Sequence, residues 1–160
     1  KSIPNKIFKA ADSQVASRWG NITEFKNFDL ITPNEREARF ALADQDSTVG
    51  RLAARLIETC SYKNLILKLG DRGVFCSTTI KNDSKSNYFS VDSFANNSKD
   101  PVGAGDAFLS VTAPLVSVGT KINVAGFIGN AVGALKVGIV GHRRSVEKIP
   151  VQKYLTTLLK

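Results

Sequence analysis

The feature that most constrains the fold is an alternation of short apolar runs with longer amphipathic ones. The run "NLILKLG" at residues 64–70 is almost continuously apolar, has the length of a strand and ends at glycine, which is typical of a strand buried in a parallel sheet. Before it, residues 47–60 place Leu52, Leu56 and Cys60 at spacings of four, which predicts a helix with one apolar face and Ser47 as its N-cap. This alternation predicts an α/β fold.

The remaining periodicity extends the same pattern along the chain. Further strands are expected within "NKIFKAADS" at 5–13, at 28–31, and as an antiparallel pair within "GVFCSTT" and "NYFSVDSF", and further helices at 34–43, 104–118, 123–140 and 151–159. We therefore expect a layered α/β/α, Rossmann-like sheet in a single domain over residues 1–160. In such sheets, ligands bind at the carboxyl ends of strands and the amino ends of helices.

The composition of the chain limits the classes of partner that it is expected to bind. The formal net charge is +8, but the basic residues are scattered without the Lys/Arg run of a nucleic-acid arm, so we expect no nucleic-acid partner. The apolar stretch 107–119 is shorter than the roughly 20 residues that span a bilayer, so no membrane partner is expected either. Two cysteines without a CxxC pair indicate a reduced, cytoplasmic setting. The absence of Met indicates a piece of a longer polypeptide.

The stretch "DPVGAGDAF" contains the candidate anion-binding and catalytic residues. Amides at a helix start lack intrahelical partners, and Gly103 and Gly105 would let an anion approach them without Cβ interference. A carboxylate beside them, Asp106, fits a transferred phosphate: the amides hold the developing charge and the acid takes a proton from the attacking hydroxyl. A plainer interpretation stays open, because acids are common in first helical turns for their effect on the helix dipole.

These residues resemble the signature D-x-x-G-A-G-D-x-F of the ribokinase-like (PfkB-type) carbohydrate kinases, with Asp100, Gly103 to Asp106 and Phe108 in place. Two further family elements follow in the right order. "TPNEREA" matches the N-x-x-E element through Asn34 and Glu37, and "LKLGDRG" matches the nucleotide turn, with Lys68 where Thr is common.

The resemblance implies a set of site residues. Asp106 would be the catalytic base beside the amides of Gly103, Ala104 and Gly105, and Asn34 and Glu37 would help to place magnesium and phosphate. Nucleotide contacts would come from Asn34, Lys68, Asn130 and the turn Gly70, Asp71, Arg72 and Gly73. A potassium ion would be bordered by Asp100, Val102, Lys136, Gly141 and Ser145. Taken singly, Asn34 and Glu37 could simply begin a helix, and Gly70 and Gly73 could be hairpin glycines.

The resemblance covers the whole chain but only the C-terminal half of the family's fold. It implies transfer of phosphate from ATP to a sugar or sugar phosphate in the parent protein, with Mg²⁺ and K⁺ as cofactors. The stretches at 11–38 and 91–107 look most like heptose-phosphate kinase modules related to ADP-heptose synthase. We expect this chain alone to bind nucleotide with little activity, and to dimerise or to need its N-terminal half or a partner chain. A regulatory or scaffold protein that keeps the fold is the alternative.

Overall fold

The computed structural model describes residues 4, 6–13, 22–79, 87–95, 100–140 and 144–160. Two compact units make up the chain: a first unit of residues 1–69 and 75–89, and a second unit of residues 70–74 and 90–160. Five strands form one sheet in the order β1, β2, β3, β4, β5. Their bounds are β1 Ala10–Ala11, β2 Leu30–Ile31, β3 Asn64–Lys68, β4 Val74–Thr78 and β5 Asn87–Val91.

The first three strands are parallel. Ala11 pairs with Ile31, and Ile31 in turn pairs with Leu65 on β3. Leu65, Ile66 and Leu67 are fully buried, as the unbroken apolar run predicted. Their common direction brings the carboxyl ends of β1, β2 and β3 to one edge of the sheet.

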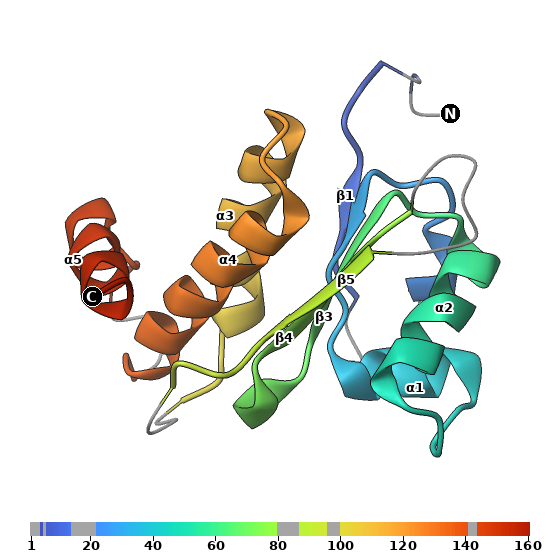
Figure 1. Ribbon diagram of the computed structural model, residues 1–160, viewed down its shortest axis with the longest axis horizontal. Helices are drawn as coiled ribbons and strands as arrows, with labels where there is room; N and C mark the ends of the chain where they lie inside the picture. The colour runs from blue at the N-terminus through green and yellow to red at the C-terminus, as the bar shows by residue number, and fades with distance from the viewer. Residues whose placement is uncertain (1–3, 5, 14–21, 80–86, 96–99, 141–143) are drawn as a thin grey trace. The chain divides into compact units, whose positions relative to one another are not determined.

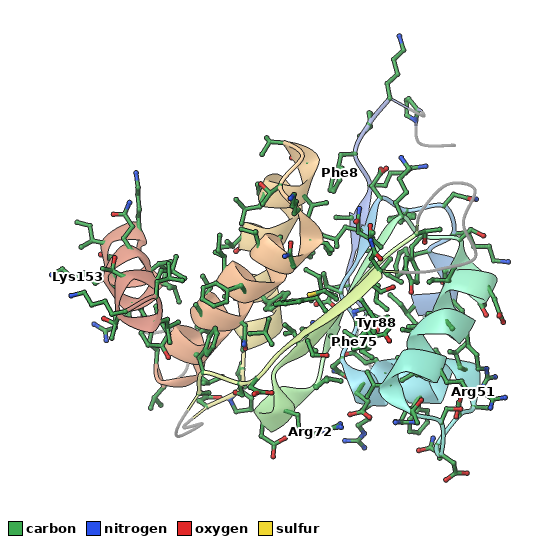
Figure 2. The ribbon with its side chains drawn as sticks, viewed as in Figure 1. Phe8, Arg51, Arg72, Phe75, Tyr88 and Lys153 are labelled. Atoms are coloured by element: carbon green, nitrogen blue, oxygen red, sulfur yellow. The ribbon has the colours of Figure 1, made fainter. Side chains whose placement is uncertain are left out.

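β4 runs antiparallel to β3, and β5 runs antiparallel to β4, which confirms the predicted antiparallel pair. The amide of Thr79, just after β4, donates to the carbonyl of Lys63, just before β3 (2.9 Å), so these two strands are antiparallel. Gly73, just before β4, lies against the carbonyl of Val91 at the end of β5. The rings of Phe75 on β4 and Tyr88 on β5 are stacked with their centroids 5.8 Å apart. Both residues are labelled in Figure 2.

Helices α1 (Glu35–Leu42) and α2 (Val49–Cys60) cover one face of this sheet (Figure 1). The apolar face predicted for α2 is correct, because Leu52, Leu56 and Cys60 are all fully buried. The predicted N-cap is wrong by one residue: the Thr48 hydroxyl, not Ser47, accepts from the Arg51 amide. The core of this unit contains the buried side chains Ala11, Ile22, Ile31, Ala38, Leu52, Leu56, Tyr62, Leu65, Leu67 and Phe75.

The second unit is built on α3 (Ala104–Ser117) and α4 (Ile122–Val137), followed by α5 (Lys148–Leu158). Gly129 on α4 faces Thr112 and Phe108 on α3 so closely that a Cβ there would lie 2.5 Å from Thr112 Cγ2. Gly129 therefore allows α3 and α4 to pack closely at this position. The hydroxyl of Tyr154 on α5 donates to the Phe94 carbonyl (2.9 Å), which ties the last helix to the segment after β5.

Two short 3-10 turns, Ile22–Glu24 and Gly70–Arg72, complete the described elements. Cys60 and Cys76 are buried and free, as expected for a chain without a disulfide framework. Among the described residues, no helix combines the length and the apolar character needed to cross a membrane.

Candidate functional site

Five side chains gather where the parallel strands end. Asp12 and Ser13 follow β1, Thr32 follows β2, and Lys68 is the last residue of β3. Glu37 joins them from the first turn of α1. We call Asp12, Ser13, Thr32, Glu37 and Lys68 the strand-end cluster. It lies entirely within the first unit and at the edge of the sheet where α/β proteins bind ligands.

Asn34 and Glu37 form a reciprocal cap at the start of α1. The Glu37 amide donates to Asn34 Oδ1, and the Asn34 amide donates to Glu37 Oε2, each at 2.8 Å. The N-x-x-E spacing is thus that of a capping box, which satisfies two amides that the helix leaves unpaired. It also fixes the direction of the Glu37 carboxylate, and Glu37 is buried, which is unusual for a residue that serves only as a cap.

Lys68 forms an ion pair with Asp12. Lys68 Nζ lies 2.6 Å from Asp12 Oδ2, and both side chains are less than one-fifth exposed. Lys68 also pairs with Asn34 in an isolated parallel bridge, and its amide donates to the Pro33 carbonyl (2.9 Å), so its backbone lies beside the start of α1.

Burial has the largest effect on the pKa values of the two acids in this cluster. Desolvation raises the pKa of Asp12 even though the charge of Lys68 lowers it. Desolvation likewise raises the pKa of Glu37, against the Asn34 amide and the charge of Lys68, and the charge of Asp12 raises it further. The two acids and the ammonium therefore interact as one group.

The hydroxyls of Ser13 and Thr32 are buried without a hydrogen-bond partner in the described part of the chain. Each nonetheless lies close enough to an acid to lower its pKa: Ser13 lowers the pKa of Glu37, and Thr32 lowers the pKa of Asp12. Buried polar groups are rarely left unpaired, so these two oxygens indicate a place for water or a ligand.

The cluster fits a magnesium ion better than a zinc ion. Within the described ranges, no three histidine, cysteine or acidic side chains come together as a metal-binding group. Magnesium is usually held by only one or two carboxylates with water and substrate phosphates. Asp12 and Glu37 supply two carboxylates beside two unpartnered hydroxyls.

The second unit holds the residues of the glycine-rich signature. Gly103 is the N-cap of α3 with φ 75°, a left-handed conformation that favours glycine. The Ala104 amide donates to the Pro101 carbonyl (3.2 Å), so within the described part of the chain the first-turn amides without a backbone acceptor are those of Gly105 and Asp106. Asp106 is exposed, so its carboxylate is accessible beside these amides.

The predicted nucleotide turn also lies in this unit. Gly70, Asp71 and Arg72 form the 3-10 turn, all exposed, and the Gly73 amide closes it on the Gly70 carbonyl (3.1 Å). Gly73 has φ 84°, and a Cβ there would lie 2.0 Å from the Val91 carbonyl oxygen. A larger residue does not fit at this position.

The other predicted residues are more scattered. Asn130 is buried, and its Nδ2 donates to the Asp92 carbonyl (2.7 Å). The Asp100 amide donates to the Val137 carbonyl (3.1 Å), which brings Asp100 to the end of α4, beside the buried Lys136. Asp100 Oδ1 accepts from the Val102 amide. Val102 and Ser145 are exposed, and Gly141 lies outside the described residues.

Sequence reasoning thus selected Asn34, Glu37 and Lys68, which the fold brings together, but missed Asp12, Ser13 and Thr32. A signal for them was available. Asp12 and Thr32 each follow an apolar strand directly, and Ser13 comes one residue later, at the edge where parallel strands end; a polar residue in such a position is a candidate ligand contact.

Comparison with known proteins decides the family. Residues 9–149 match the profile described as pfkB family carbohydrate kinase. The chain belongs to this family. A curated relative, the bifunctional protein HldE of Desulfatibacillum aliphaticivorans, is 28% identical over 142 residues, which cover 85% of this chain and 28% of that protein. The family assigned from the glycine-rich signature is therefore confirmed.

Solved structures agree with the fold. A point mutant of phosphofructokinase-2 from Escherichia coli superposes with a TM-score of 0.75 at 18% identity over 94% of this chain and 47% of its own. A putative ribokinase II from Escherichia coli, solved with ATP and Mg²⁺, gives 0.63 at 27% identity over 81% and 40%. The predicted ribokinase-type α/β fold is correct. The chain spans less than half of these structures and about a quarter of HldE.

Proposed function

We propose that the protein containing this chain transfers the γ-phosphate of ATP to a hydroxyl of a sugar or sugar phosphate. The observation that carries the proposal is the start of α3. A left-handed Gly103, two unpaired amides and an exposed Asp106 lie within one helical turn, in a member of a carbohydrate kinase family.

Asp106 is proposed as the general base. Its carboxylate takes the proton of the acceptor hydroxyl while that oxygen forms a bond to the γ-phosphorus, and the bond from phosphorus to the bridging oxygen of ADP breaks. The amides of Gly105 and Asp106 donate to the phosphoryl oxygens, where negative charge gathers in the transition state. The helix dipole adds to this stabilisation.

Asp12, Glu37 and the Asn34 side chain would hold Mg²⁺, in part through water. Bound there, Mg²⁺ would neutralise charge on the ATP phosphates. The ribokinase II structure was solved in complex with ATP and Mg²⁺, and that protein is 27% identical to this chain, which supports both cofactors here.

For the nucleotide we propose Asn34, Lys68, the turn Gly70 to Gly73, and Asn130. The exposed residues Gly70 to Arg72 offer their backbone, and Gly70 carries no side chain that would block it, whereas Gly73 is buried against Val91 and closes the turn. The Asn130 amide nitrogen is engaged with Asp92, so we propose its Oδ1 as the atom that contacts the nucleotide.

A potassium site remains a proposal from the family resemblance, with Asp100, Val102, Lys136, Gly141 and Ser145 at its border. The bond from the Asp100 amide to Val137 supports part of it, because it brings the loop before α3 to the end of α4. Replacing potassium with sodium in the assay should then lower the rate.

The identity of the acceptor and the assembly of the protein are not fixed by membership of the family and are separate proposals. We propose a heptose phosphate as acceptor, on the resemblance to heptose-phosphate kinase modules, and a cytoplasmic location. We also propose that acceptor contacts come from a part of the fold beyond these 160 residues, in the same polypeptide or in a partner chain such as the second copy of a dimer. The coverage of less than half of the solved structures supports this.

The test is Asp106→Asn in the intact protein. Loss of a general base lowers turnover by about 10²–10⁴-fold, while MgATP affinity should change little. Asp46→Asn is the matched control, because Asp46 is exposed and lies outside both groups of site residues. Normal turnover in Asp106→Asn would refute the role of Asp106. No transfer from the wild-type protein to any sugar in a panel would favour the regulatory or scaffold alternative.

A further inference from the structure

The Lys68 side chain lies in an unusual place for an ammonium group. It ends the central parallel strand β3 and reaches Asp12 of the neighbouring chain segment, 56 residues earlier, at 2.6 Å. The Lys68 backbone pairs with Asn34, whose amide donates to the Glu37 carboxylate. An ammonium with few exposed atoms thus stands at the strand ends, close to both acids of the cluster.

The two buried hydroxyls of the strand-end cluster are a second observation. Ser13 and Thr32 are buried next to these acids, and their oxygens have no hydrogen-bond partner among the described residues. The ion pair between Lys68 and Asp12 therefore does not include either hydroxyl. Oxygen atoms from two carboxylates and two hydroxyls are the donors that a hard divalent cation takes.

We propose that Lys68 is a positioning residue whose ammonium acts as the counter-ion of Asp12. The ammonium competes with a divalent cation for the Asp12 carboxylate. It therefore limits cation binding when no nucleotide is present. The competition is physical. A single positive charge on Lys68 both occupies an oxygen of Asp12 and repels a second cation, and partial burial strengthens this repulsion. When nucleotide is bound, the Lys68 ammonium would attract the nucleotide phosphates.

This inference deepens the proposed function, and it rests on that function only for the statement about nucleotide. Its central claim concerns the cation alone. Mn²⁺ is a suitable probe, because carboxylate, hydroxyl and water oxygens are its usual ligands.

The experiment measures Mn²⁺ binding by calorimetry on the nucleotide-free chain. Lys68→Gln keeps a hydrogen-bond donor for Asp12 but removes the charge, and Lys68→Met removes both. Each should bind Mn²⁺ at least tenfold more tightly than wild type, whereas Lys68→Arg should stay within twofold. If Lys68 only held the fold together, its removal would weaken cation binding or leave it unchanged.

Two controls make the result specific. Lys63→Met breaks a more exposed ion pair, with Asp29, at the opposite end of β3, and should leave Mn²⁺ affinity within twofold of wild type. The double variant Asp12→Asn, Lys68→Gln should not show the tighter Mn²⁺ binding expected for Lys68→Gln alone, because the Asp12 carboxylate would supply the added affinity.

The possible results distinguish a failure of this inference from a failure of the proposed function. Equal Mn²⁺ affinity in wild type and Lys68→Gln, or no binding by either, would overturn the inference. If Lys68→Met unfolds, as circular dichroism would reveal, Lys68→Gln still decides the question. Failure of the wild-type chain to bind MgATP in a separate titration would count against the proposed function and would leave the Mn²⁺ result standing.

Discussion

Replacing Gly129 by alanine should destabilise the second unit through a steric conflict between α3 and α4. The added Cβ would lie 2.5 Å from Thr112 Cγ2 and 2.8 Å from two ring atoms of Phe108. Ordinary contacts between carbon atoms are about 3.5–4.0 Å, so the helices must separate by roughly 1 Å or the side chains must turn.

Neither adjustment is easy. Thr112 is fully buried, and its hydroxyl donates to the Phe108 carbonyl at 2.9 Å, which holds its methyl group toward Gly129. Overpacking of this kind costs about 1–3 kcal/mol. The better helix propensity of alanine returns about 0.5–1 kcal/mol, so a net loss of about 1–2 kcal/mol is expected.

Urea unfolding and thermal melting of the chain measure this loss. For a chain of this size, about 1–2 kcal/mol corresponds to a Tm lower by about 2–8 °C. Gly50→Ala is the matched control: Gly50 lies within α2, is exposed, and its Cβ would meet nothing within 4 Å. It should gain about 0.5–1 kcal/mol. Equal stabilisation by both substitutions would refute the close contact at Gly129.

Three further changes test separate contacts. Gly73→Ala should cost about 1–3 kcal/mol from its positive φ alone, with the clash against Val91 in addition, and an unchanged urea midpoint would contradict that geometry. Tyr62→Phe removes the buried bond from the Tyr62 hydroxyl to the Ala53 carbonyl (2.8 Å) and should cost about 1–3 kcal/mol in the same assay. Desolvation raises the pKa of Asp44, but hydrogen bonds from Ser47 and Arg55 outweigh it and lower the pKa to about 2. Because a depressed carboxyl pKa stabilises the fold above the unfolded value, this contribution is complete above about pH 3.8 and disappears as the pH falls toward 2. Asp44→Asn should flatten the acid side of the stability curve, and identical acid unfolding would speak against the bonds.

Local patterns predicted much of the site. The N-x-x-E spacing placed Asn34 and Glu37 at the start of α1, because a capping box depends only on residues three positions apart. The glycine-rich stretch likewise predicted the start of α3 with Asp106 in its first turn. The error at the start of α2 is of the same local kind: Ser47 and Thr48 are both good N-caps, and the Ser47 amide is engaged by Asp44, one turn back.

The sequence by itself determined the order of strands and helices and the family, because periodicity, caps and a glycine-rich signature depend on neighbours along the chain. Only the tertiary structure decided that Lys68 pairs with Asp12, that Ser13 and Thr32 lose their contact with water, and that Gly129 must be small. Asp12 and Lys68 are 56 residues apart and become neighbours because three parallel strands end at one edge of the sheet. Which strand ends meet, and which helix faces press together, depends on packing over the whole fold, and the local pattern does not encode it.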